Sequence, residues 1–193
     1  TDTTIKFVRP QRTLTQEPQD IGFSPDFSIE NEIVEYRKKA WEAWQTLPFP
    51  ADKDEDWRRT SLKNLALKDY KEASAQNYIE SSLPTHLEKT LDEKNQGGRV
   101  FISGAKTDLF LEKHLQDQGV IFSDFQSIMA SKPGLLSRLL GKFNEPFDHK
   151  FAALSASIGK NGILLYVPRN IKVEKPLQSI TWLAGEGILQ TSH

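Results

Sequence analysis

Cysteine is absent from the 193 residues, and this absence excludes several kinds of chemistry. Without a thiol the chain forms no disulfide, offers no thiolate nucleophile and ligates no iron–sulfur cluster through sulfur. No apolar run approaches the length of a membrane span, and the polar residues 1–12 do not resemble a signal peptide, so we expect a cytoplasmic chain. A net charge of -1 argues against a surface for nucleic acid or anionic membrane.

The composition that remains is typical of an ordinary globular protein. Hydrophobic residues make up 37% of the chain and charged residues 26%, and the length suffices for one core or two small ones. Residues 1–26 combine scattered prolines with little periodicity, which predicts a flexible N-terminal arm. We expect a mainly helical domain over residues 27–158 and a strand-rich domain over residues 159–193.

The strongest local signal is a segment that holds three of the four tryptophans. Apolar residues recur at three- and four-residue steps over residues 29–47, which predicts an amphipathic helix with Ser28 as its N-cap. Pro48 and Pro50 end this helix, because proline lacks the amide proton that a helix needs. The chain then passes through a charged loop to a Trp-Arg-Arg sequence that begins at Trp57.

The Trp-Arg-Arg sequence has two interpretations. Arginine beside tryptophan can bind an anionic ligand or nucleic acid through stacking and charge. Alternatively, Trp57 fills a gap beside the first helix, while Arg58 and Arg59 pair with the carboxylates of residues 52–56. We favour the structural interpretation, because those carboxylates would cancel a basic patch.

The middle of the chain predicts short helices around a small sheet. Pro84 is expected in the first turn of a helix over residues 85–93. Residues 100–102 and 119–122 are expected to be two buried strands that pair with each other. Further helices are expected to begin at Ser123, Pro133 and Asp148.

From residue 162 onward the pattern changes to short extended runs. Strands are expected over residues 163–167, 171–173, 177–183 and 188–191. Only a few turn residues separate these runs, which suits either hairpins or the coils of a parallel β-helix. Sequence spacing alone does not distinguish the two.

No residue is predicted to serve catalysis, a cofactor or a metal ion. Residues 103–107, Ser-Gly-Ala-Lys-Thr, follow a strand but lack the glycine spacing of a phosphate-binding loop. The leucine-rich residues 135–140 are expected in the core, because the segment is too short and too weakly basic for a membrane anchor. The histidines, His86, His114, His149 and His193, show no metal-ligand spacing. His114 beside Glu112 and His149 beside Asp148 could each join a site formed in three dimensions, but a surface or capping role is favoured for both.

A pattern of R-x-x-A, L-P-x-P and E-x-W-R-x-T-x-L runs through the tryptophan segment. It is formed by Arg37, Ala40, Leu47, Pro48, Pro50, Glu55, Trp57, Arg58, Thr60 and Leu62. This pattern resembles the N-terminal region of the SufB/SufD family, and its SufD branch more than its SufB branch. A second similarity, over residues 151–177, lies where that family leaves its helical region and enters a right-handed β-helix. Ser155 departs from the asparagine of many relatives, but the spacing after it is kept.

The resemblance implies an α+β fold: a mainly helical N-terminal domain with a small sheet, leading into the first coils of a right-handed parallel β-helix. It implies a non-catalytic scaffold subunit that joins SufB-like and SufC-like subunits, the latter an ATPase, in the SufBCD complex. That complex assembles an iron–sulfur cluster transiently, so no cofactor is expected in this chain. A homodimer is expected when the partners are missing.

A β-helix coil buries its inner face only against the next coil, so about three repeats are needed for stability. We therefore expect the N-terminal part of a longer protein, whose residues from 162 onward fray or pair with another molecule in isolation. Two alternative functions stay open. One is a protein-binding module with an open β edge, and the other is a carbohydrate-active β-helix enzyme with clustered carboxylates.

Overall fold

The computed structural model describes residues 20–73, 85–88, 95–103, 106–142 and 145–193, and these form an α+β fold. Its helices are α1 (Val34–Thr46), α2 (Thr85–Glu88), α3 (Lys113–Asp117), α4 (Phe125–Ser131), α5 (Leu135–Leu139) and α6 (Lys150–Ile158), with a 3-10 turn η1 (Leu67–Asp69). Its strands are β1 (Lys71–Glu72), β2 (Gly98–Ser103), β3 (Lys106–Leu111), β4 (Ile121–Asp124), β5 (Ile163–Tyr166), β6 (Leu177–Trp182) and β7 (Ile188–Leu189).

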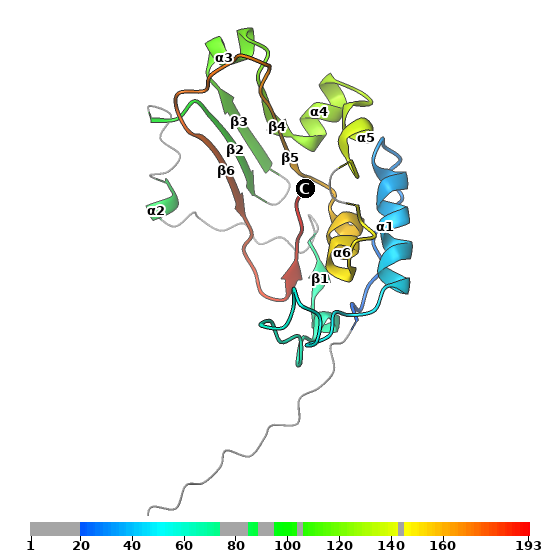
Figure 1. The fold of residues 1–193 in the computed structure, drawn as a ribbon. Helices are drawn as coiled ribbons and strands as arrows, with labels where there is room; N and C mark the ends of the chain where they lie inside the picture. The colour runs from blue at the N-terminus through cyan, green and yellow to red at the C-terminus, as the bar shows by residue number, and fades with distance from the viewer. Residues whose placement is uncertain (1–19, 74–84, 89–94, 104–105, 143–144) are drawn as a thin grey trace, which may run out of the picture.

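Helices α1, α4, α5 and α6 lie on one side of the molecule and the largest sheet on the other (Figure 1). Helices α1 and α6 lie side by side, the sheet β3-β2-β6 faces them from the other side, and the C-terminal residue lies between the two layers. Within the described residues no helix is long and apolar enough to cross a membrane. The α+β class is confirmed, whereas the β-helix stays a prediction.

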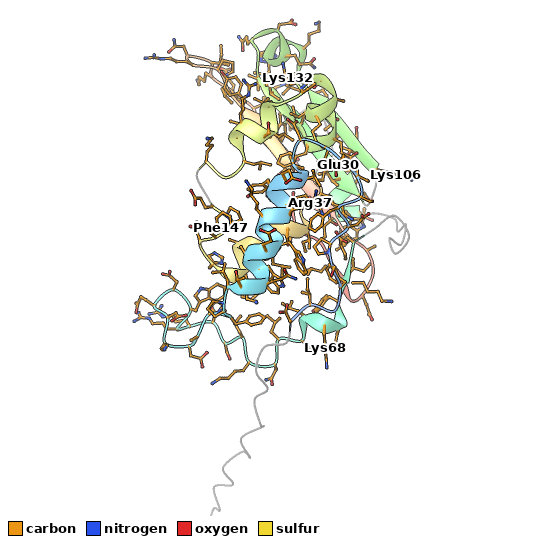
Figure 2. The ribbon with its side chains drawn as sticks, turned by 90° about the vertical axis from the view of Figure 1, so that its right-hand side faces the viewer. Glu30, Arg37, Lys68, Lys106, Lys132 and Phe147 are labelled. Atoms are coloured by element: carbon orange, nitrogen blue, oxygen red, sulfur yellow. The ribbon has the colours of Figure 1, made fainter. Side chains whose placement is uncertain are left out.

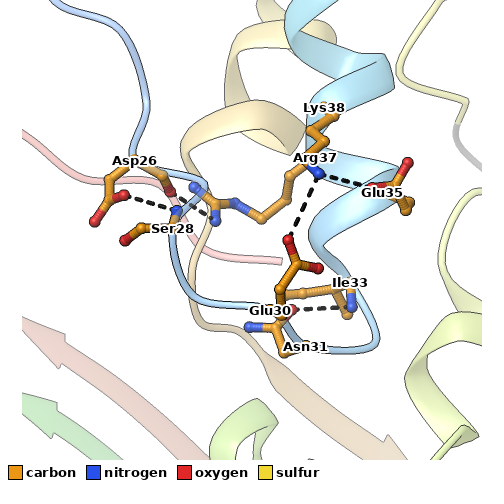
Figure 3. A network of polar contacts seen from close by, with 8 residues as sticks. All are labelled: Asp26, Ser28, Glu30, Asn31, Ile33, Glu35, Arg37 and Lys38. Atoms are coloured by element: carbon orange, nitrogen blue, oxygen red, sulfur yellow. Dashed lines mark hydrogen bonds and ion pairs between the residues drawn. The ribbon is translucent and has the colours of Figure 1, made fainter.

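Helix α1 begins later than the sequence suggests. The backbone N–H of Ser28 donates to the Asp26 side chain, so Ser28 lies in a turn and does not cap the helix (Figure 3). The N-cap is Ile33, whose own N–H donates to the Asn31 side chain at 3.1 Å. The predicted cap was wrong because local Asp and Asn turns compete with the helix for the same backbone donors.

Two buried cations hold α1 against α6. On α1, the Arg37 guanidinium donates through Nε to the carbonyl of Ser157 at 3.0 Å, near the C-terminus of α6 (Figure 2). On α6, the Lys150 ammonium donates to the carbonyls of Trp44 and Leu47 at 2.9 Å each, at the C-terminus of α1. The helices are therefore antiparallel, and each supplies a positive charge to the negative end of the other's dipole.

Aromatic rings and aliphatic side chains fill the space between these two contacts. The Lys150 ammonium lies 4.3 Å from the centre of the Trp44 ring and 4.6 Å from that of Phe49, within the range of cation–π attraction. The buried residues of this cluster are Ala43, Trp44, Leu67, Ala153, Leu154 and Ile158. The predicted role of the tryptophan-bearing helix as core is confirmed.

The sheets differ from the predicted pairing. Strand β2 pairs antiparallel with β3 and parallel with β6, while β4 pairs antiparallel with β5. Residues 100–102 and 119–122 thus do not pair with each other as expected. Strand β3 was not predicted, because its first three residues, Lys106, Thr107 and Asp108, are polar and exposed, as suits the edge strand of a hairpin.

Further differences from the predictions concern two helix N-caps and one strand. Ser123 lies within β4, so α4 is capped instead by Asp124, whose Oδ1 accepts from the backbone N–H groups of Gln126 and Ser127. Helix α6 is capped by the Nδ1 of His149 rather than by Asp148. Residues 171–173 form no strand, because Asn170, at φ 67°, turns the chain just before them.

The strands after residue 162 pair with strands earlier in the same chain. Strand β6 lies beside β2, β7 pairs parallel with β1, and β5 pairs with β4. The sequence had suggested that residues from 162 onward fray or pair with another molecule in isolation. In the structure these strands pair within the same chain. The boundary predicted at residues 158 and 159 stays a prediction, although strand pairing crosses it. The predicted arm falls largely outside the described residues.

Gly162 packs closely against the Phe125 ring and against His193 next to its main chain. The rings of Phe125 and His193 are 5.7 Å apart at an interplanar angle of 5°. A Cβ atom on Gly162 would lie 2.6 Å from Cζ of Phe125 and 2.8 Å from Cβ of His193. Only glycine leaves room here for both Phe125 of α4 and His193, which lie on either side of the residue before β5.

We expect Gly162→Ala to destabilise the chain by about 1–3 kcal/mol through overpacking. Urea unfolding measures the change. The penalty should shrink in a Phe125→Ala background, since the nearest of the three close atoms, Cζ of Phe125, is then gone. An unchanged unfolding midpoint for Gly162→Ala would contradict this account.

Lys150→Met is expected to cost about 1.5–3 kcal/mol, because two buried carbonyls lose a charged donor while the aliphatic volume is kept. Thermal or urea unfolding provides the measurement. The exposed Lys39→Met on α1 is the matched control and should change stability by less than about 0.5 kcal/mol. Equal losses in both variants would show that Lys150 does not cap α1.

Candidate functional site

The loop over residues 47–67 carries most of the sequence motif and is built from consecutive turns. Pro48 and Pro50 follow the last turn of α1, as predicted. Asp54 then closes a turn in both directions: its N–H donates to the Ala51 carbonyl at 2.9 Å, and its Oδ2 accepts from the Ala51 N–H at 2.8 Å. Trp57 and Thr60 extend the series, each donating its N–H to the carbonyl three residues earlier.

Trp57 anchors this loop to α6. Its ring stacks on Phe151 at 5.3 Å, with an interplanar angle of 29°, and meets the edge of His149 at 6.0 Å. Arg58 pairs with Glu55 at 3.1 Å, as predicted for a neighbouring carboxylate. The Trp-Arg sequence therefore serves packing and local charge pairing, and the structural interpretation is supported over the anion-binding one.

The same loop encloses a shallow pocket with a volume of about 360 Å³. Its apolar wall comes from Phe49, Pro50 and Leu62. Asp52 and Lys63, also on its wall, pair at 2.9 Å. This ion pair is exposed to solvent, so it is worth little in energy. The pocket therefore offers a place for an apolar side chain more readily than a centre for bond chemistry.

The histidines do not gather in one place. His114 is exposed and lies 3.6 Å from Glu112, His149 caps α6, and His193 lies against Phe125 and Tyr36. The side chain of His86 lies outside the described part of the chain. Across the described ranges no group of three His, Asp or Glu side chains could hold a metal ion.

The end of the phosphate-loop candidate lies in a strand, and the leucine-rich segment contributes to the core. Lys106 and Thr107 begin β3, opposite Ser103 and Ile102 of β2, whereas a phosphate-binding loop leads into a helix. In the leucine-rich segment, Leu136 is buried in a cluster whose other buried members are Ile33, Phe125 and Ile128. The predicted place in the core is confirmed for Leu136, whereas Leu139 of the same segment is 40% exposed.

Sequence reasoning missed Arg37 and Lys150 as structural residues. Arg37 is 3% exposed and Lys150 is 5% exposed, values uncommon for charged side chains. Burial lowers the pKa of Arg37, while the carboxylates of Glu72 and Asp26 oppose that shift. One signal was available: Arg37 stands four residues after Ile33 and three before Ala40, within the apolar stripe of the helix.

Burial also lowers the pKa of His193 below its ordinary value of 6.5. The carbonyl of Gly159 acts to raise this pKa, and the charge of Arg37 acts to lower it. The neutral imidazole is thus the form that suits the folded chain. The unfolded chain takes up a proton at higher pH than the folded chain does.

Stability from His193 should accordingly be complete above about pH 6.5 and be lost as the pH falls from there toward the lower folded-state pKa. His193→Phe keeps a ring on Phe125 but removes the titration, so its stability should depend less on pH over this window. Urea unfolding at several pH values measures the difference. The exposed His114→Gln should behave like the native chain, and equal pH profiles for all three would contradict the assignment.

Comparison with known proteins follows the same regions. The family model described as SufBD protein N-terminal region matches residues 27–179. An iron–sulfur cluster assembly SufBD family protein of Staphylococcus saprophyticus is 24% identical over 98% of this chain and 42% of its own length. The iron–sulfur cluster assembly protein SufD of Bacillus subtilis is 28% identical over 75% of this chain and 33% of its own length. No solved structure matches the chain.

The chain thus spans less than half the length of these two curated relatives. The family match includes the whole tryptophan segment, α1, α6 and β5, on which the site described above is built. The predicted resemblance is confirmed: the chain belongs to the SufB/SufD family and corresponds to its N-terminal region.

Proposed function

We propose that this chain is the N-terminal part of a SufD-like, non-catalytic scaffold subunit of a cytoplasmic iron–sulfur cluster assembly complex. The observation that carries the proposal is the family match over residues 27–179, together with relatives whose names state iron–sulfur cluster assembly. In this proposal the partners are a SufB-like subunit and a SufC-like ATPase.

The geometry supports a structural task for this region. The motif residues Trp57 and Arg58 are used for packing and local pairing. Two buried cations, Arg37 and Lys150, are used to join helices. A rigid helical pair of this kind suits a scaffold, which must hold other subunits in fixed positions.

The iron–sulfur cluster is the cargo of the proposed complex. This chain has no cysteine, so thiolate ligands must come from other subunits or from other parts of the protein. In this proposal the described region serves as a framework that positions the other subunits. It consists of a helical layer and, beside it, strands in which early and late parts of the chain pair.

The test uses the full protein that contains this chain, produced with a cleavable tag beside the SufB-like and SufC-like proteins of its own organism. Co-purification of both subunits, and restored activity of iron–sulfur enzymes in cells that lack the native gene, are the expected results. Purification without either subunit, or failure to restore that activity by a well-folded protein, would overturn the proposal.

A paired variant separates a scaffold from an enzyme. Asp52→Asn with Lys63→Met removes the charges on the wall of the pocket and should change the rate of cluster assembly by less than about twofold. Loss of a general acid or base lowers a rate by about a hundredfold or more. A decrease of that size in a folded complex that still contains both partners would assign bond chemistry to the pocket.

A further inference from the structure

The pocket in the loop over residues 47–67 has an apolar wall that is open to solvent. Phe49, Pro50 and Leu62 supply the apolar surface, and the volume of about 360 Å³ lies at the small end of the range for ligand pockets. Such a pocket suits one or two apolar side chains better than a cofactor.

The rim of this pocket carries negative charge that the fold neutralises only in part. Residues 52–56 contain four carboxylates and one lysine. Two of the carboxylates pair with nearby cations: Asp52 with Lys63, and Glu55 with Arg58. Asp54 and Asp56 are exposed and form no ion pair with any described residue. A segment that places an apolar side chain in the pocket should therefore carry cations beside it.

The first described residues lie next to this pocket. The Asp20 carboxylate is 3.8 Å from the Lys150 ammonium, and the same ammonium is 4.6 Å from the centre of the Phe49 ring on the pocket wall. Figure 1 shows the start of the described chain, in blue, at the same end of the molecule as the cyan loop. The N-terminal segment, residues 1–19, is thus attached beside the pocket.

The sequence of the N-terminal segment has the chemistry that complements the pocket. Phe7 is its only aromatic residue. Residues 5–12 contain no carboxylate and three cations, which are Lys6, Arg9 and Arg12. The chain from Phe7 to Asp20 spans up to about 40 Å when extended, which is ample for it to turn back to the pocket.

We propose that the pocket is the docking site of the chain's own N-terminal segment, with Phe7 inserted between the side chains of Phe49 and Leu62. Burial of the aromatic ring among apolar groups stabilises this contact. Arg9 and Arg12 lie at the acidic rim and pair with carboxylates of residues 54–56. An attached segment also has a higher effective concentration at the pocket than a separate molecule has. While docked it closes the pocket, so a partner that uses this surface must displace it.

The cysteine-free chain allows a direct test by disulfide formation. Val8→Cys with Lys53→Cys keeps Phe7 and places the second thiol on the pocket wall. The matched pair is Val8→Cys with Lys68→Cys. Lys68 is also exposed (Figure 2), and its carbonyl lies 2.9 Å from where a Cβ on Gly22 would stand, so it is close to the attachment of the N-terminal segment.

Under mild oxidation the Lys53 pair should form its intramolecular disulfide at least about tenfold faster than the Lys68 pair, because docking raises the local concentration of the thiol at the pocket. Equal rates for the two pairs would overturn the proposal. Disulfide-linked dimers whose yield rises with protein concentration would indicate that the segment docks on a second copy, which would also contradict it.

Two further changes in the Lys53 pair separate the apolar contact from the charges. Phe7→Ser should lower the rate to that of the Lys68 pair, because the buried ring is lost, and an unchanged rate would contradict the proposal. Arg9→Gln with Arg12→Gln should lower the rate by about two- to fivefold at low salt. The difference should largely disappear at about 0.5 M salt, where exposed charges are screened. A difference that does not depend on salt would overturn the assigned pairing with the rim.

Discussion

The reciprocal capping of α1 and α6 is the contact on which the rest of the described structure depends. A buried charge is costly unless hydrogen bonds compensate for its lost hydration, and both cations find carbonyls that a helix end leaves without partners. The two contacts lie at opposite ends of an antiparallel pair, so they fix both the register and the direction of the helices. The loop with Trp57 begins where α1 ends, and β5 follows closely after α6. The candidate site thus takes its position from this pair.

Gly162 connects the helical pair to the strands through its contacts with neighbouring segments. It follows α6 by a few residues, bonds to Phe125 at the start of α4, and faces His193. Three segments far apart in the sequence therefore meet where one residue has no side chain. The pKa of His193 is lowered at the same point because the stack that fills the space above the glycine also excludes water. The burial of His193 against Phe125 thus accounts both for the close packing at this point and for the lowered pKa of His193.

Periodicity in the sequence predicted the strongest helices and the last strands, since α1, α6, β5 and β6 are apolar at regular steps. It did not predict which strands pair. Strand β6 pairs with β2 across 79 positions, Gly98 facing Leu177, and no local pattern encodes such a partner. It also missed β3, whose exposed polar residues read as a loop, and placed three caps one or more residues away because Asp, Asn and His side chains compete for nearby donors.

The candidate site was harder to predict for a related reason. A motif such as E-x-W-R-x-T-x-L suggests a binding site. In the structure, however, Trp57 stacks on Phe151 and Arg58 pairs with Glu55. The residues most unusual in physical terms, Arg37 and Lys150, are remarkable only once their burial is known. A sequence can show that a cation lies on an apolar stripe. It does not show the carbonyls that accept its hydrogen bonds, because these belong to a helix more than a hundred residues away. For a scaffold, the informative sites are therefore those where distant backbone groups meet, as at the carbonyls of Ser157 and Trp44.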